Sequence, residues 1–447
     1  MFPIAICAVA ATLMAPACLP AQDARLAAAK RAAEKIRADD ILRDVSYLAS
    51  DANMGRRTPS PGFESPGYDS AAAYIARFLK ASGVKPMGDN GTYFQHYTVT
   101  RATLDTTAAS GAIGGEPLRW GDDFIINNFL VPGVREADVI YVGNGIRLLK
   151  EGVDPYAGFD IKGKWLLVNA PVGGGGRGAA AAGAGAAAGT AAGTIGVDYL
   201  TINEIARHGN ALGILLVPTP AQIATWNRRA TTGQDLNPAV GIAYAQFQIP
   251  RVLLSVAAFR RLLDGSKLSA DEVLRADSLK RYPASVKLDK KLKINFAATT
   301  VDARPYNVVG FLEGSDRTHR DEWISLAAHL DGALPVAASQ PGNGLADQYN
   351  AADDNASGSA GNMAVVRALL AGPRPKRSIL LVWDSGEEVG LWGTRTVAYG
   401  PWSEKITLHV SNDMIGRSKT PDGVNQQNLS GPDEIYITGP KLLSSNT

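Results

Sequence analysis

The chain has 447 residues, of which 45% are hydrophobic and 20% are charged, a composition ordinary for a globular protein with a sizeable core. This length allows two or three domains. The formal net charge is only +2, so bulk charge gives no argument for binding to nucleic acid or to an anionic membrane surface.

Residues 4–18 form an apolar stretch that is too short to span a bilayer as a helix. Small residues and then polar residues follow it, which is the order found in a secretory signal peptide. We therefore expect residues 1–21 to be a signal peptide, cleaved after Ala17 or Ala21, and the mature protein to be secreted or periplasmic. No Lys or Arg precedes the stretch, which departs from the usual pattern.

The only two cysteines, Cys7 and Cys18, both lie in this segment. The mature chain is therefore expected to form no disulfide, and a metal site in it must be built from histidine and carboxylate side chains. Lipidation of Cys18 stays open, although residues 15–17 fit a lipidation signal poorly. No other stretch is long and apolar enough to cross a membrane.

Two helices and one strand are predicted before residue 130. Residues 24–50 are Ala-rich with Leu, Ile and Val at helical spacing, and residues 68–82 carry a second apolar helical stripe. A loop rich in Gly, Pro and Ser separates the two helices over residues 54–67. Residues 92–104 alternate between apolar and polar side chains in the manner of a strand.

The composition shifts after about residue 130, where short β-rich runs are separated by turn residues. These runs lie at residues 137–145, 162–171, 211–220 and 248–256. Residues 173–196 between them are almost entirely Gly and Ala, which is typical of a surface loop. The four consecutive glycines of this stretch are not followed by Gly-Lys-Ser/Thr, so they do not form a phosphate-binding loop.

Strands and helices alternate from about residue 293 onward. This alternation predicts an α/β fold with a mixed, mostly parallel sheet flanked by helices. Strands are predicted at residues 307–314, 323–331, 378–386 and 406–416, and helices at residues 356–372 and after Glu387.

Charged groups stand at the ends of three of these predicted strands. In a largely parallel sheet the carboxyl ends of the strands share one edge, and functional groups gather there. The four segments that converge at this edge carry His329 and Asp331, then Asp354, then Glu387 and Glu388, and finally Asp413. This convergence is the main functional signal in the sequence.

Four motifs occur in order at these positions: AHLD at 328–331, NAADDNASG at 350–358, DSGEEVGLWG at 384–393 and SNDMIG at 411–416. Together they resemble the signature blocks of the two-zinc aminopeptidases of family M28, close to the secreted bacterial members. The segment from LRDVSYLASDANMGR to YFQHYTV also resembles the N-terminal part of that family's peptidase domain.

The resemblance covers nearly the whole mature chain and implies a zinc exopeptidase fold with an inserted β-rich protease-associated domain. The domains implied are a signal peptide at 1–21, the N-terminal part of the peptidase domain at 22–130, the protease-associated insert at 131–285, and the remaining zinc peptidase domain at 286–447.

The resemblance also implies which residues would bind each of two zinc ions. Zinc takes imidazole and carboxylate ligands, and two zinc ions about 3.5–4 Å apart can share a carboxylate. Asp354 would be this bridging carboxylate, His329 and Asp413 would complete the first site, and Glu388 would bind the second ion.

Two further residues receive roles from the same resemblance. Glu387 would be the general base, which takes a proton from the attacking water and passes it to the leaving amine. Asp331 would accept a hydrogen bond from His329 and fix the tautomer of its imidazole.

The sequence departs from the family pattern at its end. Family members have one more zinc ligand, a histidine well beyond the SNDMIG motif, but no histidine follows His409 here. His409 and Asp413 share a strand face but stand roughly 13 Å apart along a strand, too far to hold one ion together. We therefore expect the sequence to be a C-terminally truncated fragment whose second zinc site lacks its histidine.

These observations predict a metallo-aminopeptidase that acts on peptides. A carboxypeptidase or dipeptidase that uses the same site, and an inactive truncated protein that binds partners through its protease-associated domain, remain as alternatives. A serine hydrolase is disfavoured because no Gly-x-Ser-x-Gly motif occurs. No nucleic-acid partner and no membrane span are expected, and the sequence leaves the oligomeric state open.

Overall fold

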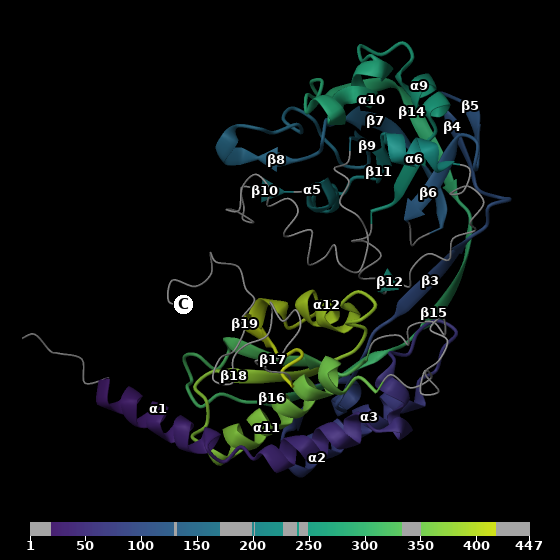
Figure 1. Ribbon diagram of the computed structural model, residues 1–447. Helices are drawn as coiled ribbons and strands as arrows, with labels where there is room; N and C mark the ends of the chain where they lie inside the picture. Colours follow the sequence, from purple (N-terminus) through teal and green to yellow (C-terminus); the bar gives the residue numbers. More distant parts are fainter. Residues whose placement is uncertain are drawn as a thin grey trace, which may run out of the picture. The chain divides into compact units, whose positions relative to one another are not determined.

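The computed structural model describes residues 19–128, 132–169, 199–200, 202–226, 239–240, 249–332 and 350–416 (Figure 1). Residues 1–18 of the predicted signal peptide, the Gly- and Ala-rich stretch at 173–196, and everything after residue 416 lie outside this part of the chain. No helix within the described ranges is both long and apolar enough to cross a membrane.

The chain divides into two compact units. The first unit comprises Met1–Thr58, Ser65–His96 and Tyr306–Asp433, and the second comprises Pro59–Glu64, Tyr97–Pro305 and Glu434–Thr447. All six residues predicted to act in the site lie in the first unit.

The first unit contains a six-stranded sheet with the strand order β1-β16-β18-β17-β19, in which β2 also pairs with β16. Its strands are β1 (Lys85–Pro86), β2 (Phe94–His96), β16 (Tyr306–Leu312), β17 (Trp323–His329), β18 (Ser378–Asp384) and β19 (Ile406–Ser411). Its helices are α1 (Leu19–Ala33), α2 (Ala38–Leu48), α3 (Pro66–Ala81), α11 (Gly358–Ala371) and α12 (Trp392–Ala398), with short helical turns at η1 (Asp51–Arg56), η2 (Asp89–Gly91), η5 (Ala352–Ser357) and η6 (Ser403–Lys405).

This sheet is mixed, but it is not mostly parallel. β17 pairs in parallel with β18 and β19, whereas β16 pairs antiparallel with β18, β1 and β2. The prediction of a mostly parallel sheet therefore fails for the described strands. Its physical reason is the connection at residues 313–322, which joins β16 to β17 without a crossover helix and so reverses the chain direction.

Helices cover both faces of this sheet, which explains why β18 is a continuous apolar run. Along β18, Ile379, Leu381 and Trp383 pack with side chains of α2, α3 and α11, whereas Leu380 and Val382 pack on the opposite face with α12. Figure 1 shows α2, α3 and α11 together on one side of the strands and α12 on the other. The period of two along a strand sends alternate residues to these two cores.

The N-terminal helices follow the predicted pattern with one difference. The stretch predicted as helical at 24–50 forms two helices, α1 and α2. The helix predicted at 68–82 is α3, whose start is defined by Pro66 in its first turn and by Ser65, whose hydroxyl accepts the N–H of Tyr68 at 3.3 Å.

The second unit is β-rich. An eight-stranded sheet has the order β5-β4-β14-β7-β9-β11-β13-β6, and smaller sheets have the orders β12-β3-β15 and β10-β8. The strands are β3 (Val99–Leu104), β4 (Ser110–Ile113), β5 (Glu116–Arg119), β6 (Phe124–Asn128), β7 (Gly133–Tyr141), β8 (Arg147–Leu148), β9 (Trp165–Val168), β10 (Tyr199–Leu200), β11 (Gly213–Leu216), β12 (Ala239–Val240), β13 (Arg251–Leu254), β14 (Val286–Phe296) and β15 (Ala298–Ala303). The helical segments are η3 (Leu149–Glu151), α5 (Ile202–His208), α6 (Pro220–Ala224), α9 (Val256–Leu263) and α10 (Ala270–Leu279).

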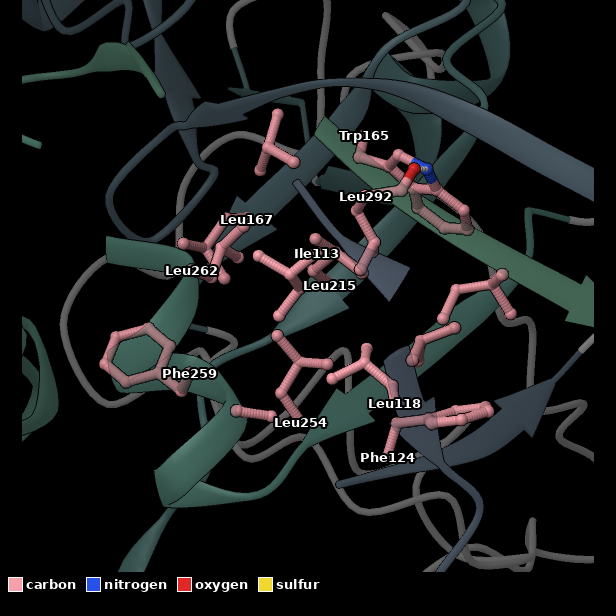
Figure 2. Close-up of a cluster of buried hydrophobic side chains, with 14 of the residues drawn as sticks. Ile113, Leu118, Phe124, Trp165, Leu167, Leu215, Leu254, Phe259, Leu262 and Leu292 are labelled. Carbon is pink, nitrogen blue, oxygen red and sulfur yellow. Dashed lines mark hydrogen bonds between the residues drawn. The ribbon is translucent and has the colours of Figure 1, made fainter. Parts of the chain in front are cut away.

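The second unit has its own hydrophobic core, drawn in Figure 2. Strand residues such as Leu167 and Leu215 pack there against Phe259 and Leu262 of α9. The indole N–H of Trp165 donates to the carbonyl oxygen of Leu292 at 3.2 Å, which satisfies the one polar atom of this buried ring. A separate core supports its description as a unit that folds around its own apolar side chains.

The second unit begins earlier and ends later than the predicted insert at 131–285. β4 pairs with β14 and β6 pairs with β13, so residues before 131 complete the eight-stranded sheet. The strand predicted at 92–104 is likewise divided between the units, because β2 pairs with β16 while β3 pairs with β15. The predicted bounds came from the family resemblance and the change in residue usage near residue 130, whereas the compact units of the structure divide near residues 97 and 305.

A buried ion pair joins the helices that cover the first sheet. Asp44 of α2 is fully buried and accepts from Arg367 of α11 at 2.7 Å and from the Tyr74 hydroxyl of α3 at 2.7 Å. We expect Asp44→Asn to destabilise the first unit by about 3 kcal/mol, because it leaves the Arg367 cation without its charged partner. This figure is at the lower end of the cost of breaking a buried ion pair, since the Arg367 side chain is 30% exposed.

Urea denaturation of the variant measures this change, and Asp39→Asn is the matched control on the same helix. Asp39 pairs with Arg37 at 3.7 Å with both side chains largely exposed, so its loss should change stability by less than about 0.5 kcal/mol. Equal effects of the two substitutions would contradict the assigned role of Asp44.

Candidate metal centre

The candidate site lies where β17 ends in the first unit. His329 is the last residue of β17, Asp354 lies in the turn η5 before α11, and Asp413 follows β19. One ligand atom from each of these three side chains lies within 4.8 Å of the others. Within the described ranges this is the one such group of histidine, cysteine and acidic side chains.

Hydrogen bonding fixes the orientation of the imidazole. Nδ1 of His329 lies 2.9 Å from the carbonyl oxygen of Asp331, and because a carbonyl can only accept, Nδ1 carries a hydrogen and donates. Nε2 then faces Oδ1 of Asp354 at 3.1 Å and Oδ1 of Asp413 at 3.3 Å. One imidazole nitrogen and two carboxylates thus point toward a common place.

The structure changes the role predicted for the Asp331 side chain. Its Oδ1 lies 3.6 Å from Nδ1 of His329, beyond hydrogen-bond distance, so the main-chain carbonyl rather than the carboxylate orients the imidazole. The carboxylate instead accepts the backbone N–H of Glu387 at 3.3 Å. Asp331 therefore connects the imidazole, through its main chain, to the Glu387 segment, through its side chain.

The surrounding carboxylates determine the charge of the imidazole. Burial by itself would lower the pKa of His329, but the carboxylates of Asp331, Asp354 and Asp413 outweigh burial and raise this pKa well above its ordinary value. In the absence of a cation the imidazole therefore carries a proton, and a metal ion that binds Nε2 must displace it.

Glu387 lies in an environment that disfavours negative charge. Burial raises the pKa of Glu387 to about 7, the negative charges of Asp331, Glu388 and Asp413 add to this shift, and His329 opposes it. A cation bound beside Glu387 would lower this pKa, because positive charge favours the carboxylate.

The segments that carry Asp354 and Asp413 are tied together by the neighbours of Asp354. The amide group of Asn355, which is fully buried, donates to the carbonyl oxygen of Asn412 at 2.9 Å and accepts the N–H of Met414 at 3.2 Å. These bonds act on both sides of Asp413, so they set the distance between the two carboxylates.

Arg56 holds two segments of the site together, although the sequence predicted only a connecting loop at this position. Its buried guanidinium donates to four carbonyl oxygens: Leu330 at 2.8 Å, Ala351 at 2.8 Å, Asn350 at 3.1 Å and Leu48 at 2.5 Å. Leu330 lies between His329 and Asp331, and Ala351 directly precedes η5, so one side chain holds both segments.

The charge of Arg56 also matters to the site. Burial lowers the pKa of Arg56 to about 10, although the negative charges of Asp331 and Asp354 favour its cation, so it stays protonated at neutral pH. The sequence signal that could have identified it is its place in the N-terminal block that resembles family M28.

Glu388, a predicted ligand, and His409, which was not expected to bind the ion, both lie outside the three-residue group. Glu388 is half-buried but is not part of the group formed by His329, Asp354 and Asp413. His409 accepts or donates at Nδ1 with the Ser325 hydroxyl at 3.1 Å and is likewise outside that group. Asp413 lies beyond the end of β19, so it does not share a regular strand face with His409.

The three converging residues fit a metal ion on chemical grounds. An imidazole nitrogen with two carboxylate oxygens is a donor set that Zn²⁺ takes in catalytic sites with three protein ligands. The orienting bond from Nδ1 to a carbonyl oxygen is the arrangement that leaves Nε2 available as a ligand. Oδ2 of Asp331, buried and without a hydrogen-bond partner among the described residues, adds negative charge that favours a cation nearby.

Comparison with known proteins assigns this region. Residues 307–435 match the model of peptidase family M28. This region belongs to peptidase family M28. The match covers all four sequence motifs and includes His329, Asp354 and Asp413, so the family predicted from the motifs is confirmed over these residues.

Solved structures similar to the chain include an aminopeptidase from Aneurinibacillus sp. strain AM-1, with 14% identity and a TM-score of 0.36 over 86% of this chain and 72% of that one. A zinc aminopeptidase from Bacillus subtilis has 15% identity and a TM-score of 0.32 over 85% and 70% of the two chains. A peptidase M28 precursor from Shewanella amazonensis has 18% identity and a TM-score of 0.33 over 88% and 74%. No curated protein matches the chain.

The geometry predicts which histidine is needed for metal binding. We expect His329→Ala to weaken Zn²⁺ binding by more than about 100-fold, since loss of an outer-shell partner alone typically costs 10–100-fold. Equilibrium dialysis with metal analysis measures this. His319→Ala is the control in the same unit, because His319 pairs with Asp316 at 3.0 Å and belongs to no ligand group. Retained tight binding in His329→Ala would contradict the site.

Proposed function

We propose that the chain is a zinc-dependent aminopeptidase that removes the N-terminal residue of peptides. The observation that carries this proposal is the convergence of His329, Asp354 and Asp413 at one place in an M28 peptidase region. The four sequence motifs resemble those of two-zinc aminopeptidases, and a carboxypeptidase or dipeptidase that uses the same site is the alternative.

The residues present allow a ligand for each of two ions. His329, Asp354 and Asp413 would hold one zinc ion, and Asp354 and Glu388 would hold a second. Bound zinc supplies Lewis acidity, which polarises the carbonyl group of the scissile bond. The chain itself must then place a base next to the attacking water.

Glu387 is the proposed general base. Its carboxylate would accept a proton from the attacking water and deliver it to the leaving amine. Two contacts support this role: the backbone N–H of Glu387 is held by Asp331 at 3.3 Å, and Asp331 also orients His329 at 2.9 Å through its carbonyl group. The base and the imidazole ligand therefore share one positioning residue.

The proposal includes two features outside the site. The apolar stretch at residues 4–18 supports export from the cytoplasm by a signal peptide. The β-rich second unit, with its own core, supports the interpretation of this part of the chain as a protease-associated domain.

Peptides blocked at one end or the other distinguish an aminopeptidase from a carboxypeptidase. We expect the zinc-loaded chain to cleave a short peptide with a free amino terminus and an amidated carboxyl terminus, and to leave intact an N-acetylated peptide of the same sequence whose carboxyl terminus is free. Mass spectrometry of the products identifies the residue released, and a chelator should abolish the reaction. Cleavage of the acetylated peptide from its carboxyl end would overturn the aminopeptidase proposal in favour of a carboxypeptidase.

The proposed base gives a separate prediction. We expect Glu387→Gln to lower kcat by about 10²–10⁴-fold, because an amide cannot accept the proton of water, while zinc content stays at the wild-type level. Steady-state kinetics with metal analysis measure both quantities. Glu404→Gln, an exposed glutamate in the same unit, is the control and should leave kcat unchanged. Wild-type kcat in Glu387→Gln would remove Glu387 from the mechanism.

A further inference from the structure

The segment at residues 385–387, which carries Glu387, runs from β18 toward α12 and has an unusual pattern of hydrogen bonds. Its three consecutive backbone N–H groups all donate to side chains from other parts of the chain. Asn307 Oδ1 accepts from Ser385 at 3.1 Å, Thr58 Oγ1 accepts from Gly386 at 2.7 Å, and Asp331 Oδ1 accepts from Glu387 at 3.3 Å.

The carbonyl groups of the same three residues are bonded within the chain that follows. Ser385 accepts from Gly393 at 2.8 Å, Gly386 accepts from Trp392 at 3.0 Å, and Glu387 accepts from Leu391 at 3.1 Å. The backbone of this segment is thus held on its N–H side by three distant elements and on its carbonyl side by the start of α12.

Two glycines allow this close arrangement. Gly386 has a φ of +71°, and a Cβ there would lie 2.9 Å from the Trp392 side chain. A Cβ at Gly393 would lie 2.1 Å from Oδ1 of Asn307, so only glycine lets Asn307 reach Ser385. The backbone conformation is therefore determined by contacts rather than by local preference.

Thr58 makes the shortest of the three N–H contacts. Thr58 is 4% exposed. It lies two residues after Arg56, whose guanidinium binds the segments that carry His329 and Asp354. Gly386, the residue that Thr58 holds, is the immediate neighbour of Glu387. A shift of Gly386 must therefore move Glu387 relative to those segments.

We propose that Thr58, which follows the turn η1, is a positioning residue that sets the place of Glu387 by accepting the N–H of Gly386. This inference rests on the proposed role of Glu387 as general base. Thr58 itself touches no reacting atom; it acts through the backbone of the segment that carries the base.

The test compares Thr58→Val, which keeps the shape of the side chain but removes the acceptor, with Thr58→Ser, which keeps the hydroxyl group. In Thr58→Val we expect kcat to fall about 10–100-fold with little change in KM or zinc content, because small displacements of a catalytic group are that costly. We also expect faster hydrogen exchange of the Gly386 amide, since its N–H loses its buried acceptor. Thr58→Ser should restore both properties.

Thr407→Val is the matched control. The Thr407 hydroxyl also bonds a backbone group of the same unit, the carbonyl oxygen of Trp323 at 3.1 Å, but it lies at the start of β19 and its acceptor is outside residues 385–387. This variant should keep wild-type kcat and wild-type exchange at Gly386.

Each outcome decides the proposal. Unchanged exchange at Gly386 or wild-type kcat in Thr58→Val overturns it, and so does a loss of zinc that accounts for the fall in kcat, because Thr58 would then act through the metal ligands. If the wild-type chain shows no peptidase activity, the proposed function fails, and exchange at Gly386 still decides whether Thr58 holds this segment.

Discussion

The buried guanidinium of Arg56 is the contact on which the geometry of the site depends. It donates to carbonyl oxygens on either side of the site, at Leu330 beside the imidazole ligand and at Ala351 before the η5 turn. A fully buried cation is costly unless its donors are bonded, and here main-chain carbonyl groups satisfy them. Positive charge at this place also offsets the surplus of carboxylates, so Arg56 contributes both geometry and charge.

The same type of contact recurs throughout the site: a buried side chain forms a hydrogen bond with the backbone of a segment that carries a functional group. Asn355 does so for the segment of Asp413, while Asn307 and Thr58 do so for the segment of Glu387. Residues beyond the end of a strand have no ladder partners, so their N–H and carbonyl groups need other ones. Side chains that satisfy these groups hold the loops in place.

The mixed sheet explains why these segments meet. β17, β18 and β19 run parallel, so the residues that follow them emerge at one edge, while β16 runs the other way and brings Asn307 near its start to that same edge. The antiparallel strand β16 thus contributes Asn307 from its start, whereas a parallel strand would contribute residues that follow its end. The second unit contributes no member of the three-residue group found among the described residues.

The sequence by itself determined the strands that lead to the site, the order of the motifs, and the meeting of His329, Asp354 and Asp413, because short apolar runs that end in charged residues are local signals. Only the tertiary structure decided the antiparallel placement of β16, the extent of the β-rich unit, and the hydrogen-bond partner of Asp331. It alone also assigned roles to Arg56 and Thr58. Each of these depends on contacts between residues far apart in the chain, often from a side chain to a main-chain group, and such contacts leave no periodicity in the sequence.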